Sequence, residues 1–92
     1  MRYAAMLNAK VQAHLVVPEM VEMMHLSGTT TLAIQVAPDG RLIGVSVGRS
    51  SGSGEIDRAA IAAVRSSRLP PFPDGMPQRP VTFDLRVRLS AS

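Results

Sequence analysis

The sequence predicts a small two-layer α+β domain, with a three-stranded antiparallel sheet and helices packed on one face in the order α-β-β-α-β. Three observations lead to this fold. Two runs of alternating apolar and polar residues flank a Pro-Asp-Gly turn, an alanine-rich segment with helical spacing follows, and a third alternating run closes the chain. The 92 residues suffice for a single domain, residues 1–92, with a modest core.

Composition restricts the core and the chemistry. Hydrophobic residues make up 46% and aromatic residues 3% of the chain, so we expect an aliphatic core. The absence of cysteine excludes disulfides, thiol catalysis and cysteine-based zinc sites. A formal charge of +3 favours acidic partners, but the basic residues are spread along the chain. Because the sheet also lacks stacking aromatics, we expect no nucleic-acid partner.

The first helix is predicted over residues 2–15, where Tyr3, Leu7 and Val11 share one face. Pro18 cannot continue this helix but suits the first turn of a second, short one, which we expect Gly28 to stop. The short helix carries an apolar cluster that suits core filling better than a soft metal site or an adaptable binding surface. Its members are Met20, Met23 and Met24.

A hairpin follows. Residues 29–37 alternate as a strand, residues 38–41 form a tight Pro-Asp-Gly-Arg turn, and residues 42–49 form the returning strand. The returning strand is expected to place three apolar side chains on one face, Ile43, Val45 and Val47.

The next helix begins after a flexible Ser/Gly turn at residues 50–54, with Ser53 or Gly54 as its cap. Asp57 lies in its first turn and Arg65 in its last, as the helix dipole favours. Its small side chains form a narrow stripe that lets the helix lie close to a sheet. The stripe consists of Ile56, Ala59, Ala60, Ala63 and Val64.

Prolines make residues 69–80 a stiff extended crossover that leads to the last strand, residues 81–89. This strand alternates throughout its length. Its expected core-facing residues are Val81, Phe83, Leu85, Val87 and Leu89, and its outward residues are Thr82, Asp84, Arg86 and Arg88.

The sequence lacks the groupings that catalysis requires, so we expect neither an enzyme nor a cofactor. His14 and His25 are not spaced as a paired helical metal motif, and we expect no metal site. The serines at positions 50 and 51 lack the frame of a nucleophile elbow and suit turn and cap chemistry.

The last strand admits two interpretations, which the pattern leaves open. Charged side chains protect an edge strand against aggregation. The same regular edge can instead accept an extended peptide, which pairs through main-chain hydrogen bonds while alternate side chains set specificity. A second copy of the chain could pair at this edge as well.

A fixed order of short motifs carries a resemblance to a known family. The motifs are Gly28, Pro38–Asp39–Gly40, Ser50–Ser51–Gly52, Ile56–Asp57–Arg58–Ala59–Ala60, Pro70–Pro71–Phe72–Pro73 and the final run VTFDLRVRL. In this order they resemble the C-terminal domain of TonB proteins, the energy transducers of Gram-negative bacteria. The family usually has a Tyr-Pro pair before the first strand, where this sequence has Val17 and Pro18.

The resemblance implies a periplasmic domain of a protein anchored in the inner membrane. It also implies a membrane helix and a Pro-rich spacer in the parent protein, which we expect this chain to lack. It implies that the domain binds the TonB box of outer-membrane transporters for iron chelates, haem or vitamin B12, driven through ExbB and ExbD. The implied docking residues are Val81, Thr82, Phe83, Asp84, Leu85, Arg86, Val87, Arg88 and Leu89, with Val17 and Pro18 nearby. The alternative is the similar TolA domain, which binds a TolB peptide for envelope integrity.

Overall fold

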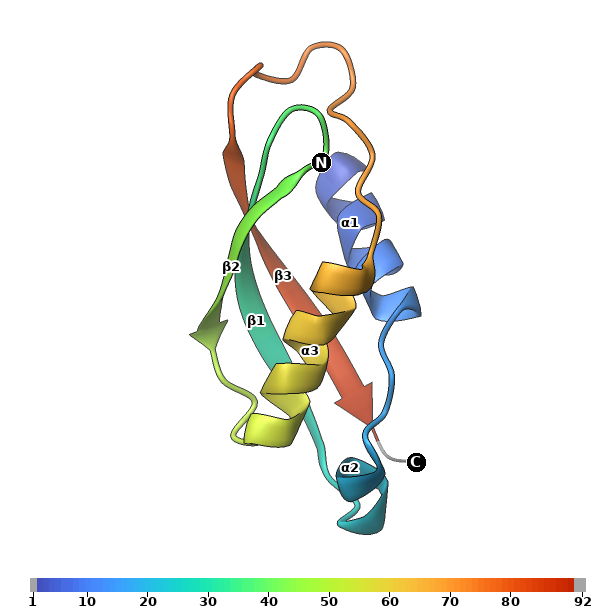
Figure 1. Cartoon of the computed structure of the whole chain (residues 1–92). Coiled ribbons are helices and arrows are strands. Elements are labelled where there is room, and N and C mark those ends of the chain that lie inside the picture. The colour runs from blue at the N-terminus through green and yellow to red at the C-terminus, as the bar shows by residue number, and fades with distance from the viewer. Residues whose placement is uncertain (1, 91–92) are drawn as a thin grey trace.

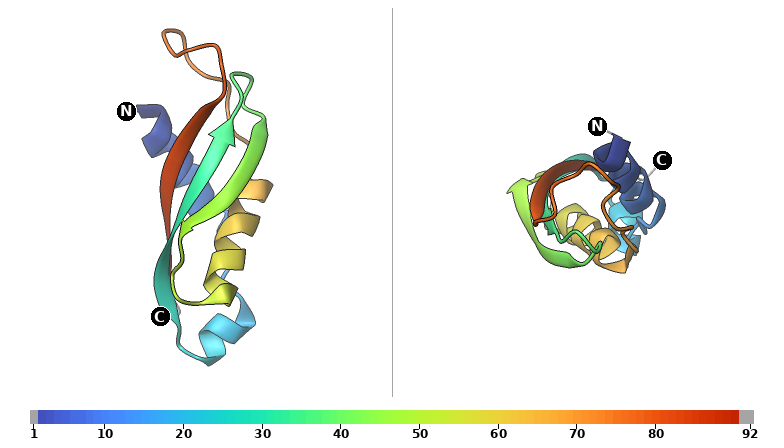
Figure 2. Two further views of the ribbon diagram at one scale, coloured as in Figure 1. Left: turned by 90° about the vertical axis from the view of Figure 1, so that its left-hand side faces the viewer. Right: turned by 90° about the horizontal axis from the view of Figure 1, so that it is seen from above.

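The computed structural model describes residues 2–90 and has one antiparallel sheet with strand order β2-β1-β3 (Figure 1). The elements in chain order are α1 (Arg2–Ala13), α2 (Glu19–Met23), β1 (Ser27–Val36), β2 (Leu42–Arg49), α3 (Gly54–Ser66) and β3 (Val81–Ser90). The helices lie on one face of the sheet and leave the other face open (Figure 2). The predicted fold class and element order are confirmed.

The central strand β1 pairs differently with its two neighbours. Its pairing with β3 runs without interruption from Ser27↔Ser90 to Val36↔Val81. Its pairing with β2 has two register shifts, which leave Gly48 and Ile43 as extra residues of β2. The predicted apolar face of β2 is therefore partly wrong: Leu42 takes the core-facing position opposite Val36, and Ile43 is 44% exposed.

The core lies between the sheet and the helices. From β1 it takes Leu32, Ile34 and Val36, and from α3 the small-residue stripe that the sequence predicts. The chain's three aromatic residues all gather in this otherwise aliphatic core. The ring of Tyr3 lies 5.1 Å from that of Phe72 and 5.4 Å from that of Phe83, centroid to centroid. The Tyr3 hydroxyl donates to the carbonyl of Pro70 at 2.7 Å, which ties α1 to the crossover.

The tight turn between β1 and β2 sits against the crossover. Gly40 has a φ of 90°, and a Cβ at this position would come within 2.4 Å of the carbonyl oxygen of Leu69. The main-chain N–H of Phe72 donates to the carbonyl of Pro38 at 2.9 Å. The Pro-Asp-Gly turn thus fixes the path of the crossover as well as reversing the chain.

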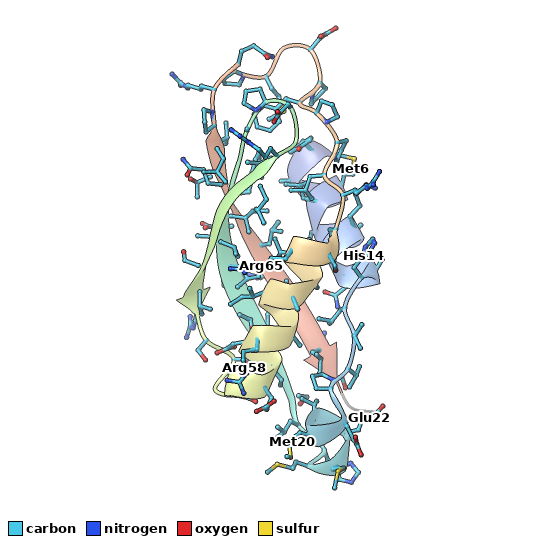
Figure 3. The ribbon with its side chains drawn as sticks, viewed as in Figure 1. Met6, His14, Met20, Glu22, Arg58 and Arg65 are labelled. Atoms are coloured by element: carbon cyan, nitrogen blue, oxygen red, sulfur yellow. The ribbon has the colours of Figure 1, made fainter. Side chains whose placement is uncertain are left out.

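The N-terminal half corrects three expectations. Helix α1 ends at Ala13 rather than at residue 15. Gly28 does not stop α2; His25 takes the left-handed conformation, with a φ of 52°, and Gly28 lies within β1. The methionines do not fill the core: Met23 is 69% exposed, and Met20 projects from α2 (Figure 3). A helix of only five residues buries one side chain, Val21, and within residues 2–90 the methionines stay exposed to solvent.

No helix within residues 2–90 combines the length and the apolar character that crossing a membrane requires.

Candidate functional site

The candidate site is the outer edge of β3, which has β1 on one side and no strand on the other among residues 2–90. Its side chains alternate as the sequence predicts. Those facing the helices are buried apart from Val81, which is half-buried, and those facing the open side of the sheet are exposed. The exposed set consists of Thr82, Asp84, Arg86, Arg88 and Ser90.

The direction of the main chain along this edge follows from one contact. In a regular antiparallel pair, alternate residues direct both their N–H and their C=O towards the same neighbour. The N–H and the C=O of Arg88 both bond to the side chain of Gln12, so Arg88 directs its main chain away from β1. The β1–β3 register has no shift, so every second residue of β3 before Arg88 also directs its main-chain groups away from β1. Thr82, Asp84 and Arg86 therefore present main-chain donors and acceptors at the free edge.

Three arginines gather on the open face of the sheet, two of them on β3 and one across β1 on β2. Arg49 of β2 and Arg86 of β3 both lie opposite Thr31 of β1, and Arg88 is two residues along β3 from Arg86. With Thr29 and Thr31 they line a shallow hollow of about 480 Å³. The ion pair found among residues 2–90 joins Arg58 to Glu55 on α3, so these three guanidinium groups have no carboxylate partner there. The hollow presents positive charge to whatever approaches the β3 edge.

The structure brings one of the two predicted N-terminal site residues to β3 and places the other elsewhere. Val17 packs against the small cluster that contains Leu89, near the C-terminal end of β3. Pro18 is the N-cap of α2, with extended backbone angles (φ −62°, ψ 147°). It lines a hollow over α3 together with His14 and Val16.

A hydrogen-bonded carboxylate holds the loop between β2 and α3. Asp57 accepts from the Thr30 hydroxyl at 2.7 Å, from the Ser51 N–H at 2.9 Å and hydroxyl at 2.8 Å, and from the Ser50 hydroxyl. Partial burial favours a higher pKa for this carboxyl group, but the hydrogen bonds prevail and lower its pKa to about 2. Asp57 is therefore an ionised acceptor at neutral pH, and the serines serve turn and cap chemistry. Ser53 caps α3 by accepting from the Ile56 N–H at 3.4 Å.

The two histidines make different local contacts and do not form a pair. Nδ1 of His14, the residue after α1, is 2.8 Å from the carbonyl oxygen of Lys10 in that helix, and His25 forms the left-handed turn after α2. Within residues 2–90, no three or more His, Cys, Asp or Glu side chains are grouped so that they could hold a metal ion.

The sequence predicted the candidate edge but missed Gln12. It lies at the C-terminal end of α1, beyond the apolar stripe, and a polar residue at such a position looks like any solvated one. No spacing or motif in the sequence indicates that it contacts a strand 76 residues away.

Comparison with known proteins shows which family the chain resembles. The family model described as "Gram-negative bacterial TonB protein C-terminal" matches residues 13–90. Two curated proteins named Protein TonB are similar to the chain. The one from Haemophilus ducreyi is 34% identical and aligns with 91% of this chain, and the one from Pasteurella multocida is 33% identical and aligns with 88%. The chain spans about one third of the length of these relatives, 32% and 33%.

Solved structures show the same fold. The solution structure of Helicobacter pylori TonB-CTD, residues 179–285, superposes with a TM-score of 0.81 at 18% identity. It aligns with 97% of this chain and 80% of that one. A shorter form of the same domain, residues 194–285, gives a TM-score of 0.74 at 19% identity, with coverage of 97% and 94%.

Proposed function

Because the chain belongs to the TonB C-terminal family, we propose that it binds the TonB box of outer-membrane transporters by adding that peptide to β3 as a fourth strand. The proteins of this family transduce energy and are not enzymes. The proposed setting is the Gram-negative periplasm, in a longer protein anchored in the inner membrane. There ExbB and ExbD would supply energy from the proton gradient.

The free edge of β3 is the observation that carries this proposal. Three residues, Thr82, Asp84 and Arg86, direct unpaired main-chain groups outward along a strand with no bulge. An extended peptide that pairs there gains main-chain hydrogen bonds whatever its side chains are. This suits a domain that serves several transporters, for iron chelates, haem or vitamin B12, because the recognised feature is an extended backbone.

The arginine hollow supports a preference among such peptides. Charges on a rim steer association more than they add to the final affinity. Arg86 and Arg88 of β3, with Arg49 across the sheet on β2, lie on the open face and present positive charge to the approaching segment. Acidic residues that flank the paired segment would therefore speed its association.

The test is a titration of the isotope-labelled chain with a synthetic TonB-box peptide, followed through backbone amide signals by NMR. We expect shifts at Thr82, Asp84 and Arg86 and little change along β2. A TolB N-terminal peptide and a TonB-box peptide with a central proline serve as controls. Sedimentation at the same concentration separates peptide binding from pairing between copies of the chain.

Each other outcome contradicts the proposal in a distinct way. Shifts with the TolB peptide alone would favour a TolA-type domain. An edge that responds to no peptide, but broadens with chain concentration, would favour a homodimer. Shifts confined to β2 would mean that the peptide pairs with the β2 edge instead of the β3 edge.

A further inference from the structure

Gln12, at the end of α1, already makes the contacts that one residue of an added strand would make. Its carboxamide NH₂ donates to the Arg88 carbonyl, and its carboxamide oxygen accepts from the Arg88 N–H at 3.1 Å. A residue of a paired antiparallel strand makes the same two bonds, one donated and one accepted. The side chain of Gln12 therefore imitates a strand residue at one position of the β3 edge.

We propose that Gln12 sets the end of the docking edge: a peptide pairs at Thr82, Asp84 and Arg86, and it must displace Gln12 to pair at Arg88. This inference rests on the proposed function for the docking event, whereas the contact itself belongs to the free chain. The surface left open fits a short extended segment that spans residues 82–86 of β3. Gln12 is thus a specificity residue for the length and register of the partner.

The direction of the partner strand does not alter this conclusion. In parallel and antiparallel pairing alike, an added strand uses the outward N–H and C=O groups of β3. Arg88 is the next outward residue after Arg86, and both of its groups are engaged by Gln12. A partner that extends past Arg86 therefore competes with Gln12 for the same donor and acceptor.

Neighbouring residues hold Gln12 in place. Val11, one residue before it, is fully buried in the main core, and Leu15, three residues after it, packs against that core and against the small cluster that contains Leu89. The backbone of Gln12 is thereby fixed beside β3, while its side chain is exposed and can leave the edge. Because a peptide would replace two hydrogen bonds with two of the same kind, the competition is modest, and we expect a factor of about five to ten in affinity.

The first experiment uses the free chain. Gln12→Met keeps the length of the side chain and its helix propensity but removes the donor and the acceptor. We expect the Arg88 amide to exchange with solvent about five- to tenfold faster in this variant than in the unsubstituted chain. Exchange at Asp84 and Arg86 should be unchanged. Gln78→Met, an exposed glutamine in the crossover, is the matched control and should leave Arg88 unaffected. Equal exchange at Arg88 in all three proteins would overturn the inference.

The second experiment compares peptides of two lengths. A five-residue TonB-box peptide covers residues 82–86, and a nine-residue peptide extends two residues further at each end. We expect Gln12→Met to bind the longer peptide about five- to tenfold tighter than the unsubstituted chain does, and the shorter peptide equally.

The outcomes separate the two proposals. If both peptides bind, and each binds Gln12→Met and the unsubstituted chain with equal affinity, the inference fails and the proposed function stands. If neither peptide binds either protein, the proposed function fails, and the inference about docking fails with it. Tighter binding of the short peptide by the variant would also contradict the inference, because Gln12 does not occupy the positions that this peptide uses.

Discussion

The two edges of this sheet are built in opposite ways. The edge strand β2 has eight residues and two bulges, with Gly48 and Ile43 as the extra residues. The edge strand β3 has ten residues, pairs with β1 without a shift and buries alternate side chains. Bulges bend and twist a strand, so β2 presents an irregular row of main-chain groups. Of the two edge strands within residues 2–90, only β3 offers an uninterrupted template to an incoming strand.

The difference shows two ways to manage a free edge. Along β2 the edge is disrupted by its own backbone. Along β3 the backbone is regular. Exposed charged side chains protect this edge from unwanted pairing, and the carboxamide of Gln12 covers its main-chain groups at Arg88. A bulged edge is a poorer template for an added strand, whereas a regular edge that a side chain covers becomes available when that side chain is displaced.

The largest expected effect is on stability and compares one core-facing residue from each edge. Leu85 of β3 is 2% exposed and Val47 of β2 is 40% exposed. We expect Leu85→Ala to lower the free energy of unfolding by about 3 kcal/mol, because it leaves a cavity under the sheet, and Val47→Ala by less than about 1 kcal/mol. Urea unfolding followed by circular dichroism measures both. Equal losses would mean that the two edges contribute alike to the core.

The second prediction concerns the loop through which β2 leads into α3. Asp57→Ala removes the acceptor for the buried Thr30 hydroxyl and for Ser51, and we expect a loss of about 2 kcal/mol in the free energy of unfolding. Asp57→Asn retains one acceptor oxygen and should lose less. A variant with unchanged urea midpoint would show that the loop is held by other contacts.

The same carboxylate gives the stability a pH dependence. Its pKa is lowered to about 2 in the folded chain from an ordinary value of 3.8, so its contribution is present above about pH 4. As the pH falls from about 4 towards 2, the unfolded state takes up the proton first and this contribution is lost. Between pH 4 and pH 2 the Asp57→Asn variant should therefore lose less stability than the unsubstituted chain. An equal loss of unfolding free energy in the two proteins between pH 4 and pH 2 would contradict this assignment.

The smallest expected effect is on the rate of peptide association. Arg86 and Arg49 both flank Thr31, but only Arg86 belongs to the docking strand. We expect Arg86→Gln to slow the association of an acidic-flanked TonB-box peptide about twofold at low salt, and Arg49→Gln to slow it less. Stopped-flow measurements at two salt concentrations test this, since the difference should shrink as salt screens the charges. A difference that persists at high salt would point to direct contact instead of steering.

The alternation of β3 could be predicted from sequence because one face is buried and the other solvated along its whole length. The stripe of α3 could be predicted for the same reason. The bulges of β2 could not, because an extra residue at Ile43 or Gly48 changes the register without leaving a clear break in the apolar pattern. The exposure of Met20, Met23 and Met24 could not be predicted, because their spacing suits a buried face and only the packing within residues 2–90 leaves them exposed.

The candidate site was predictable in part. An unbroken alternating strand at the end of a three-stranded sheet indicates an available edge, and the structure places β3 there. The alternation of side chains does not say whether the odd- or the even-numbered residues of β3 direct their main-chain groups outward; the contact between Gln12 and Arg88 shows that the even-numbered ones do. Such long-range side-chain contacts depend on how α1 packs across β3, which no local pattern records.

The central claim, docking through the backbone of β3, is tested most directly by two substitutions at one position. Asp84 directs its N–H to the free edge, so Asp84→Pro removes a docking donor without removing a bond to β1. Asp84→Ala changes the side chain alone. We predict that Asp84→Pro weakens TonB-box binding about tenfold or more, while Asp84→Ala binds within about twofold of the unsubstituted chain. Isothermal titration calorimetry on both folded variants measures this, and equal affinities would contradict docking at the β3 edge.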